Sequence, residues 1–385
     1  MTGPARLVTV VGALVLLVSC RSPASDVALV RQSWEAYRAT FVTADGRVVR
    51  PESGGDTVSE GQAYTLLRAA WMDDQATFDR VWSWTRLHLS RTDRDGTALL
   101  AWHWVPEGGG HVDDWNVATD ADGDLALALL LAADRWKVPR HPGLPPYREA
   151  AGDLLRDLLA YAWTADETGT PVLLPGAWAD QRNEGRGLVL NPSYLAPASY
   201  RLFHRATGDV RWLELAVGSY DVLETLCGSS RRTPAGPDWV RWWSQSRWTP
   251  EGGDNARSSW DAVRVPWRVA TDWLWFDEPR ARRYLSQCVA PLVRPRLSHG
   301  MAVAYDTEGE VLEADDHPLA NALYSFALAD ARERDRLLDR VRGRLVHTAQ
   351  GVFFGEPDRY YVNSLAYLPF LARARRYEPP HPPSP

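Results

Sequence analysis

Apolar residues recur at helical spacing along most of the chain. In residues 74–90, Phe78, Val81 and Trp82 fall on one face, and charged residues occupy the opposite face. This is the pattern of a helix that packs on one side against a core and is solvated on the other. Three segments have this pattern: 74–90, 208–227 and 335–347. We interpret them as outer helices.

A second kind of segment is apolar almost all round. Residues 120–136 contain an unbroken run of Leu and Ala from Leu125 to Ala133, which predicts a helix surrounded by protein. We expect no strands, because no stretch shows a convincing apolar-polar alternation. The inner kind alternates with the outer kind, which predicts an all-α fold of six helical hairpins closed into a ring. Inner helices are expected to begin near Ser59, Thr119, Asn191, Ser258, Asp316 and Tyr360.

The amino terminus has the features of an export signal. Arg6 precedes an apolar run over residues 7–18, which is too short to span a bilayer and has the length of a signal-peptide core. The run ends at Ser19-Cys20 and resembles the lipobox of bacterial lipoproteins, which implies acylation of Cys20. The alternative is an ordinary signal peptide with a chance cysteine. We expect a cleaved signal over 1–19, a lipid-anchored tether over 20–25, one domain over 26–376 and a disordered proline-rich tail over 377–385.

Composition narrows the classes of function. The net charge is −6 and there is no basic stripe, which argues against nucleic acid as a partner. The chain has 19 tryptophans; most are expected in the core, and a minority are expected to line a groove where sugar rings stack. An exported protein is expected at the cell envelope, on the periplasmic or extracellular face. A disulfide between Cys227 and Cys288 is permitted there, and the sequence leaves their pairing open.

Unusual polar residues lie where the inner helices are predicted to begin. Ser59 and Gln62 have the spacing of a capping box, and Asn191 precedes a proline at a first helical position. Inner helices that run in the same direction open their amino ends on one face of the ring. Six residues are therefore expected to converge on one cleft: Glu60, Asp120, Asp122, Tyr194, Asp261 and Arg264.

No motif in the sequence predicts a metal or cofactor site. The acidic run over 120–124 is similar to a calcium loop, but its glycine is misplaced and Leu131 stands where that loop requires glutamate. The nine histidines include no zinc-binding spacing, and phosphate-binding glycine loops are missing from the sequence. We therefore expect no metal and no cofactor.

Five stretches together resemble glycoside hydrolase family 8, with order and spacing that agree along nearly the whole predicted domain. They are Ser59-Glu-Gly-Gln-Ala-Tyr64, Ala118-Thr-Asp-Ala-Asp122, Asn191-Pro-Ser-Tyr-Leu195, Pro237-Asp-Trp-Val-Arg241 and Ser258-Ser-Trp-Asp-Ala-Val-Arg264. Within the family, the chain looks most similar to the periplasmic endoglucanases that accompany bacterial cellulose synthesis. The resemblance implies an (α/α)6 toroid and hydrolysis with inversion of the anomeric centre.

The resemblance also implies roles for individual residues. Glu60 is expected to act as general acid, Asp261 as general base, and Asp120 to hold and distort the sugar at the cleavage point. Burial or a neighbouring carboxylate such as Asp120 would keep Glu60 protonated, and Arg264 would keep a carboxylate ionised. Trp260 stands where relatives usually have tyrosine. The residues expected to bind substrate are Tyr194, Arg264, Asp122, Trp102 and Trp260.

The expected function is endo-acting hydrolysis of β-1,4-glucan, either cellulose or a related exopolysaccharide. Chitosan, xylan and mixed-linkage β-glucan stay open as substrates of the same mechanism. A polysaccharide-binding lipoprotein without turnover is the alternative from another class, although the three carboxylates together argue against it. Association with a cellulose or exopolysaccharide synthesis complex is a further expectation.

Overall fold

Helices make up most of the part of the chain that the computed structural model describes, which is residues 23–229, 232–243, 247–313 and 315–381. The predicted signal over 1–19 and the anchor Cys20 lie outside these residues. The helices are α1 Pro23–Phe41, α2 Ser59–Trp71, α3 Gln75–Leu89, α4 Thr92–Asp95, α5 Thr119–Trp136, α6 Tyr147–Ala162, α7 Pro197–Thr207, α8 Arg211–Ser229, α9 Val265–Phe276, α10 Pro279–Tyr284, α11 Ala290–Val293, α12 Pro318–Tyr324, α13 Ala331–Gly343, α14 Tyr360–Leu365 and α15 Leu368–Arg373.

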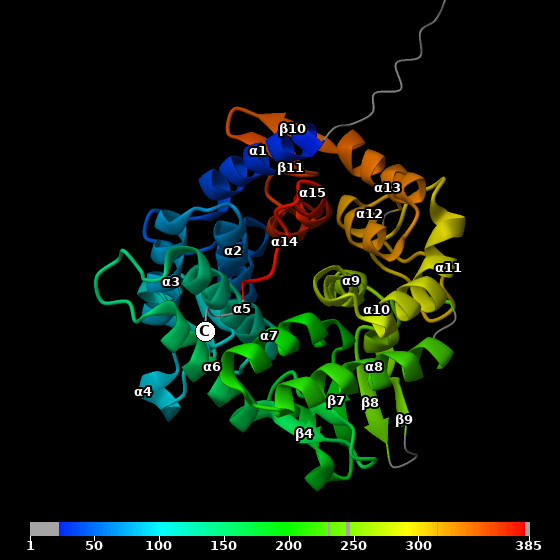
Figure 1. Ribbon diagram of the computed structural model, residues 1–385, viewed down its shortest axis with the longest axis horizontal. Helices are drawn as coiled ribbons and strands as arrows, with labels where there is room; N and C mark the ends of the chain where they lie inside the picture. Colours follow the sequence, from blue (N-terminus) through cyan, green and yellow to red (C-terminus); the bar gives the residue numbers. More distant parts are fainter. Residues whose placement is uncertain (1–22, 230–231, 244–246, 314, 382–385) are drawn as a thin grey trace, which may run out of the picture.

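The helices form two concentric rings, as the sequence predicts (Figure 1). The inner ring contains α2, α5, α7, α9, α12 and the pair α14 and α15; the outer ring contains α3, α6, α8, α10 with α11, and α13. α1 supplies the remaining outer helix and packs against α14 and α15, so the first helix of the domain closes the ring onto its last. The predicted toroid of helical hairpins is confirmed. Residues 23–25, expected in the tether, are the first turn of α1.

Burial explains the two kinds of helix. In α5 every residue from Thr119 to Ala133 is buried except Gly123, as expected for a helix with protein on all sides. In α2 every residue from Ser59 to Trp71 is buried except Glu60. The single polar side chain that keeps contact with solvent therefore lies in the first turn of α2, at the face of the ring where the inner helices begin. We call this face the mouth.

Short strands lie next to the inner helices, and the prediction of no strands is wrong. They are β1 Thr57–Val58, β2 His103–Val105, β3 His111–Asp114, β4 Trp163–Ala165, β5 Pro171–Leu173, β6 Asp180–Gln181, β7 Gly187–Leu190, β8 Val240–Trp243, β9 Arg247–Pro250, β10 Leu345–Thr348 and β11 Gly351–Phe354. β1, β2 and β3 form one antiparallel sheet, and β6 to β9 form another. Elements of two to four residues are too short to show the alternation by which strands are recognised in a sequence. β1 runs directly into α2, and β7 leads into the turn before α7, so both sheets contain a strand that ends near the start of an inner helix.

The carboxyl-terminal segment closes the opposite face of the ring. Tyr377 is buried, and its hydroxyl accepts a hydrogen bond of 2.7 Å from Trp267 Nε1. Its ring lies 4.9 Å from that of Trp71, at the end of α2. The expectation of a disordered tail is therefore wrong for residues 377–381, because an aromatic side chain there fills the base of the ring; residues 382–385 lie outside the described part.

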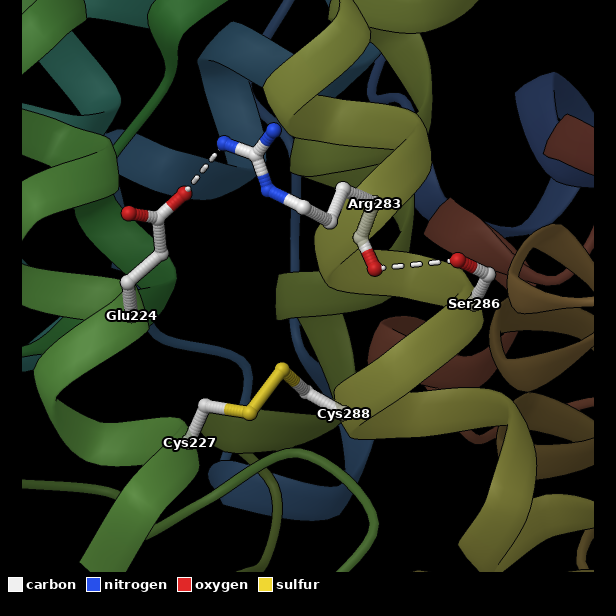
Figure 2. The surroundings of a disulfide bond; sticks show 5 residues. All are labelled: Glu224, Cys227, Arg283, Ser286 and Cys288. Atoms are coloured by element: carbon white, nitrogen blue, oxygen red, sulfur yellow. Dashed lines mark hydrogen bonds and ion pairs between the residues drawn. A yellow bond between two sulfur atoms is a disulfide. The ribbon is translucent and has the colours of Figure 1, made fainter.

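A disulfide joins Cys227 of α8 to Cys288, with 5.5 Å between the two Cα atoms (Figure 2). Cys288 lies in a π-helical turn, Leu285–Val289, that connects α10 and α11. Beside it, Arg283 pairs with Glu224 of α8 at 3.2 Å. The pairing that the sequence leaves open is thus settled in the structure, and the bond ties two neighbouring outer helices together.

Candidate active site

Arg264 is the centre of the polar cluster at the mouth. Its guanidinium donates to Asp120 Oδ2 at 2.7 Å and to Asp261 Oδ1 at 2.7 Å, and a third bond of 2.9 Å reaches the hydroxyl of Tyr64. The ring of Tyr194 lies under the guanidinium, 5.4 Å from its central carbon. One buried cation therefore joins side chains from α2, α5, the turn before α7 and the turn before α9.

The pairing of Arg264 fixes its charge and position. Burial opposes the charged form of Arg264, but the neighbouring Tyr361, Tyr64 and Asp120 hold its pKa well above the ordinary value. A buried charge of this kind is strongly destabilising when it loses a partner, by about 3–5 kcal/mol. The expectation that Arg264 pairs with a carboxylate is confirmed, and it pairs with two.

Glu60 occupies the edge of this cluster. Trp102 Nε1 donates to its Oε1 at 3.2 Å, and Ser59 Oγ donates to its Oε2 at 3.3 Å. Burial, reinforced by the negative charge of Asp120, raises the pKa of Glu60 to about 7. Asp120 therefore is the neighbouring carboxylate that the sequence suggests, and Glu60 keeps its proton to near neutral pH.

The predicted capping box next to Glu60 is wrong. α2 starts after Val58 without a side-chain cap, and the amide of Gln62 points into the protein. Its nitrogen donates to Thr85 at 2.8 Å, and its oxygen accepts from the backbone of Val48 at 2.7 Å. Gln62 thus ties α2 to α3 instead of capping its own helix. The predicted cap at Asn191 is confirmed: its side chain accepts from the Ser193 amide at 3.0 Å.

Asp261 differs from Asp120 in its access to solvent. The Asp261 side chain is 33% exposed, whereas that of Asp120 is 1% exposed, although both pair with the same arginine. Burial raises the pKa of Asp261, and Arg264 opposes this rise. Of the two carboxylates, Asp261 is the one that a water molecule at the mouth can reach.

Asp122 does not reach the mouth. Its side chain has no exposed surface, and Oδ1 accepts from the backbone amide of Leu100 at 3.1 Å. Burial raises the pKa of its carboxyl well above the ordinary value. The prediction that Asp122 binds substrate is therefore not met: two residues after Asp120, the helix turns the side chain away from the mouth and toward the loop before β2.

Aromatic side chains extend from the cluster on two sides. On one side, Tyr194 lies 6.1 Å from Trp239, which lies 5.6 Å from Trp178, whose side chain is 44% exposed. Flat rings of this kind stack on the C–H faces of sugars. The sequence alone does not single out Trp178 and Trp239 as residues near the site, although Trp239 lies within one of the five family-like stretches.

On the other side, Trp260 borders a hollow of about 610 Å³. Trp260 Nε1 donates to Glu313 at 3.1 Å, and its carbonyl accepts from the hydroxyl of Tyr361 at 2.9 Å. Trp102, which is 36% exposed, lies at the mouth itself through its bond to Glu60. Trp102 thus contacts Glu60 directly, and Trp260, which precedes Asp261 in the chain, borders a hollow that Glu60, Asp120 and Asp261 do not line.

The described residues contain neither a cluster of metal ligands nor a membrane-spanning helix. Three or more histidine, cysteine, aspartate or glutamate side chains grouped as metal ligands do not occur among them. In the same part of the chain, helices long and apolar enough to cross a membrane are not found.

The cluster has the chemistry of glycosidic bond hydrolysis. Such a site requires one carboxylic acid that is protonated near neutral pH and a second carboxylate that is ionised and reaches water. Burial raises the pKa of Glu60 to about 7, as the first group requires, and Asp261 pairs with Arg264 and is 33% exposed, which suits the second group. Aromatic surfaces on both sides suit a chain of sugars longer than the site itself.

Comparison with known proteins agrees with this reading. The model of "Glycosyl hydrolases family 8" matches residues 7–291. The chain is 34% identical over 353 residues to Endoglucanase A of Acetivibrio thermocellus, covering 89% of this chain and 68% of that protein. It is 30% identical to Endoglucanase 2 of Ruminiclostridium josui, covering 71% of this chain and 56% of that protein.

Solved structures share the fold. The endo-beta-1,4-glucanase CMCax from Acetobacter xylinum is 26% identical with a TM-score of 0.70, covering 91% of this chain and 99% of that one. The beta-1,3-1,4-glucanase from Paenibacillus sp. X4 is 22% identical with a TM-score of 0.77, covering 92% and 93%. The expected class of enzyme, a glycosidase, is confirmed, and the chain belongs to glycosyl hydrolase family 8.

Proposed function

We propose that the chain is an inverting, endo-acting hydrolase of β-1,4-glucan. Glu60 is the general acid, Asp261 is the general base, and Asp120 holds and distorts the sugar at the cleavage point. The observation that carries the proposal is the contrast between two carboxyl groups at one mouth: Glu60 has a pKa of about 7, whereas Asp261 is paired with Arg264 and remains accessible.

The proposed reaction uses Glu60 as a proton donor and Asp261 as a proton acceptor. Glu60 donates its proton to the glycosidic oxygen as the bond to the leaving sugar breaks. Asp261 removes a proton from a water molecule whose oxygen attacks the anomeric carbon from the opposite face. The bond to water forms opposite the bond that breaks, so the product has the inverted configuration. Asp120 is held by Arg264 at 2.7 Å, and its role at the sugar is proposed from its place in the family-like stretch over residues 118–122.

The substrate is proposed from the relatives and from the aromatic surfaces. Curated relatives of this chain are named endoglucanases, including one from Cellulomonas uda that is 30% identical. Exposed rings at Trp178 and Trp102 lie at and beyond the carboxylates, which favours a long polymer over a short oligosaccharide. β-1,4-Glucan is therefore the first choice. Chitosan, xylan and mixed-linkage glucan are the alternative substrates, and the same mechanism would apply to each of them.

We further propose that the enzyme works at the cell envelope, anchored through acylated Cys20. The support is the apolar run that ends at this cysteine, together with a disulfide that suits an oxidising compartment. Association with a cellulose or exopolysaccharide synthesis complex belongs to the same proposal. Incorporation of labelled fatty acid into the full chain, and its loss in Cys20→Ala, tests the anchor.

Hydrolysis of defined polymers by residues 21–385 tests the function. We expect release of reducing ends from carboxymethylcellulose, with chitosan, xylan and mixed-linkage β-glucan compared in parallel. Glu60→Gln and Asp261→Asn are expected to lose activity on the order of 100-fold or more, because each removes a proton-transfer group. Glu149→Gln, which changes an exposed first-turn glutamate of α6, is the matched control. Binding of every polymer without hydrolysis of any would support the non-catalytic alternative.

A further inference from the structure

Asp238 is a buried carboxylate that the proposed mechanism does not use. It lies just before β8 and is 4% exposed. Its Oδ1 accepts two backbone hydrogen bonds, from Ser259 at 2.7 Å and from Ala262 at 2.9 Å, and its Oδ2 accepts from the hydroxyl of Ser259. The two amides belong to residues on either side of Asp261. One side chain from the segment before β8 thus fixes the backbone before and after the proposed general base.

Asp238 completes the hydrogen bonding of the turn that follows Asp261. Asp261 is the residue that precedes the turn Ala262–Arg264, which leads into α9, and an aspartate at such a position usually accepts a hydrogen bond from a backbone amide of its own helix. The Asp261 side chain makes no such bond here. The amides that such a cap would bond are satisfied by backbone oxygens, since Val263 donates to Ser259 at 3.0 Å and Arg264 donates to Asp261 at 3.0 Å. Asp238 satisfies the remaining amide of the turn, that of Ala262, and the Asp261 carboxylate pairs with Arg264.

We propose that Asp238 is a positioning residue for hydrolysis: it fixes the backbone before and after Asp261 and thereby holds the Asp261 carboxylate in place toward the attacking water. This inference rests on the proposed role of Asp261. Asp238 also connects the base to the aromatic row, because the next residue, Trp239, places its ring 6.1 Å from Tyr194. The family-like stretch from Pro237 to Arg241 therefore gains a function in the site.

The charge of Asp238 acts on the same carboxylate. It raises the pKa of Asp261, in addition to the larger effect of burial. The charged and titratable groups that face Asp261 are Arg264, Asp120, Asp238, Tyr194 and Tyr361. Those that face Asp238 are Asp261, Arg257 at 4.0 Å and Tyr324. Removal of the Asp238 charge is therefore expected to favour ionised Asp261.

Three substitutions separate geometry from charge. Asp238→Ala removes the hydrogen-bond acceptor, and Asp238→Glu keeps the charge but displaces it by one methylene group. Both variants are expected to lower kcat on the order of 100-fold and to keep KM within about threefold, because Asp261 moves relative to the attacking water. Asp238→Asn keeps an oxygen for the two amides and an NH2 group for the Ser259 hydroxyl. Its kcat is expected to fall less than about tenfold, and the acidic limb of its kcat/KM profile to move to lower pH.

Asp166 provides the matched control. It is also a buried aspartate whose Oδ1 accepts two backbone amides, from Thr168 at 2.9 Å and Thr170 at 3.0 Å, together with the Thr168 hydroxyl. It directly follows β4, a strand at the periphery of the ring (Figure 1). Asp166→Ala and Asp166→Asn are expected to change stability and to leave kcat and the pH profile as in the unchanged chain.

Failure of the positioning role can be told apart from failure of the proposed function. Hydrolysis by the unchanged chain and its loss in Asp261→Asn test the function, and the Asp238 series tests positioning. Folded Asp238→Ala and Asp238→Glu proteins with kcat within about twofold of the unchanged chain would overturn the positioning role. If neither variant folds, Asp238→Asn decides: a kcat and a pH profile that both equal those of the unchanged chain show that neither the strength of these hydrogen bonds nor the charge acts on Asp261, and this overturns the role.

Discussion

Replacement of Glu60 by glutamine is expected to stabilise the folded enzyme at alkaline pH while it abolishes hydrolysis. Glu60 is the one residue of α2 that is not buried, yet protein surrounds its carboxyl closely enough to raise its pKa to about 7. The folded state therefore disfavours the ionised form. Glutamine has nearly the same shape and carries no charge at any pH, so it removes this penalty together with the catalytic proton.

The magnitude follows from the pKa. A rise from 4.5 to about 7 corresponds, at about 1.36 kcal/mol per pKa unit, to about 3 kcal/mol. Because the pKa of the folded state lies above that of the unfolded chain, the folded protein binds the extra proton between these values. The penalty is therefore zero below pH 4.5, grows as the pH rises, and is complete above pH 7. It is largest at pH 8, and partial exposure of Glu60 reduces it below 3 kcal/mol.

Urea unfolding at pH 4, 6 and 8 measures the effect. Glu60→Gln is expected to match the unchanged chain at pH 4 and to exceed its free energy of unfolding at pH 8 by about 2–3 kcal/mol. Glu149→Gln controls for the first-turn position, because Glu149 is an exposed glutamate in the first turn of α6. A Glu60→Gln protein that is no more stable than the unchanged chain at pH 8, or whose advantage is the same at every pH, would refute the reasoning.

Three further changes test other contacts. Trp102→Phe removes the hydrogen bond that lowers the pKa of Glu60, so the alkaline limb of kcat/KM on cello-oligosaccharides should move to higher pH. An alkaline limb at the same or a lower pH would contradict this expectation. Cys227 and Cys288 lie 61 residues apart, so reduction of their disulfide should lower the free energy of unfolding by about 4 kcal/mol, because the unfolded chain gains entropy. An unchanged urea midpoint under reducing conditions would contradict this expectation. Tyr377→Phe leaves the buried Trp267 Nε1 donor without an acceptor at the face opposite the mouth, so the free energy of unfolding should fall by about 1–3 kcal/mol while kcat is unchanged. A fall in kcat would contradict this purely structural role.

The helical ring could be predicted because inner helices differ from outer ones in composition. The run from Leu125 to Ala133 has no polar face, and α5 is indeed surrounded by protein. α2 begins at Ser59 and α5 at Thr119, as predicted, since the acidic and small residues there mark the first turn. The convergence of Glu60 and Asp120 then follows from the common direction of the inner helices.

Contacts between distant segments could not be predicted from local pattern. Arg264 lies one helical turn from Asp261, which the sequence reveals, but its second partner Asp120 is 144 residues away. Asp122 has the same acidic character as Asp120 and points to the opposite side of the helix. Asp238 caps a turn on another element, so no spacing in the sequence connects it to its partners.

The anomeric configuration of the first product tests the central claim most directly. Cellohexaose hydrolysed by residues 21–385 is followed by proton NMR from the first minutes, with Asp261→Asn as the inactive reference. The account predicts that the α-anomer of the new reducing end appears first and then mutarotates. Initial release of the β-anomer would contradict the roles of Glu60 and Asp261, and an absence of hydrolysis of every β-1,4-linked polymer would contradict the enzymatic function.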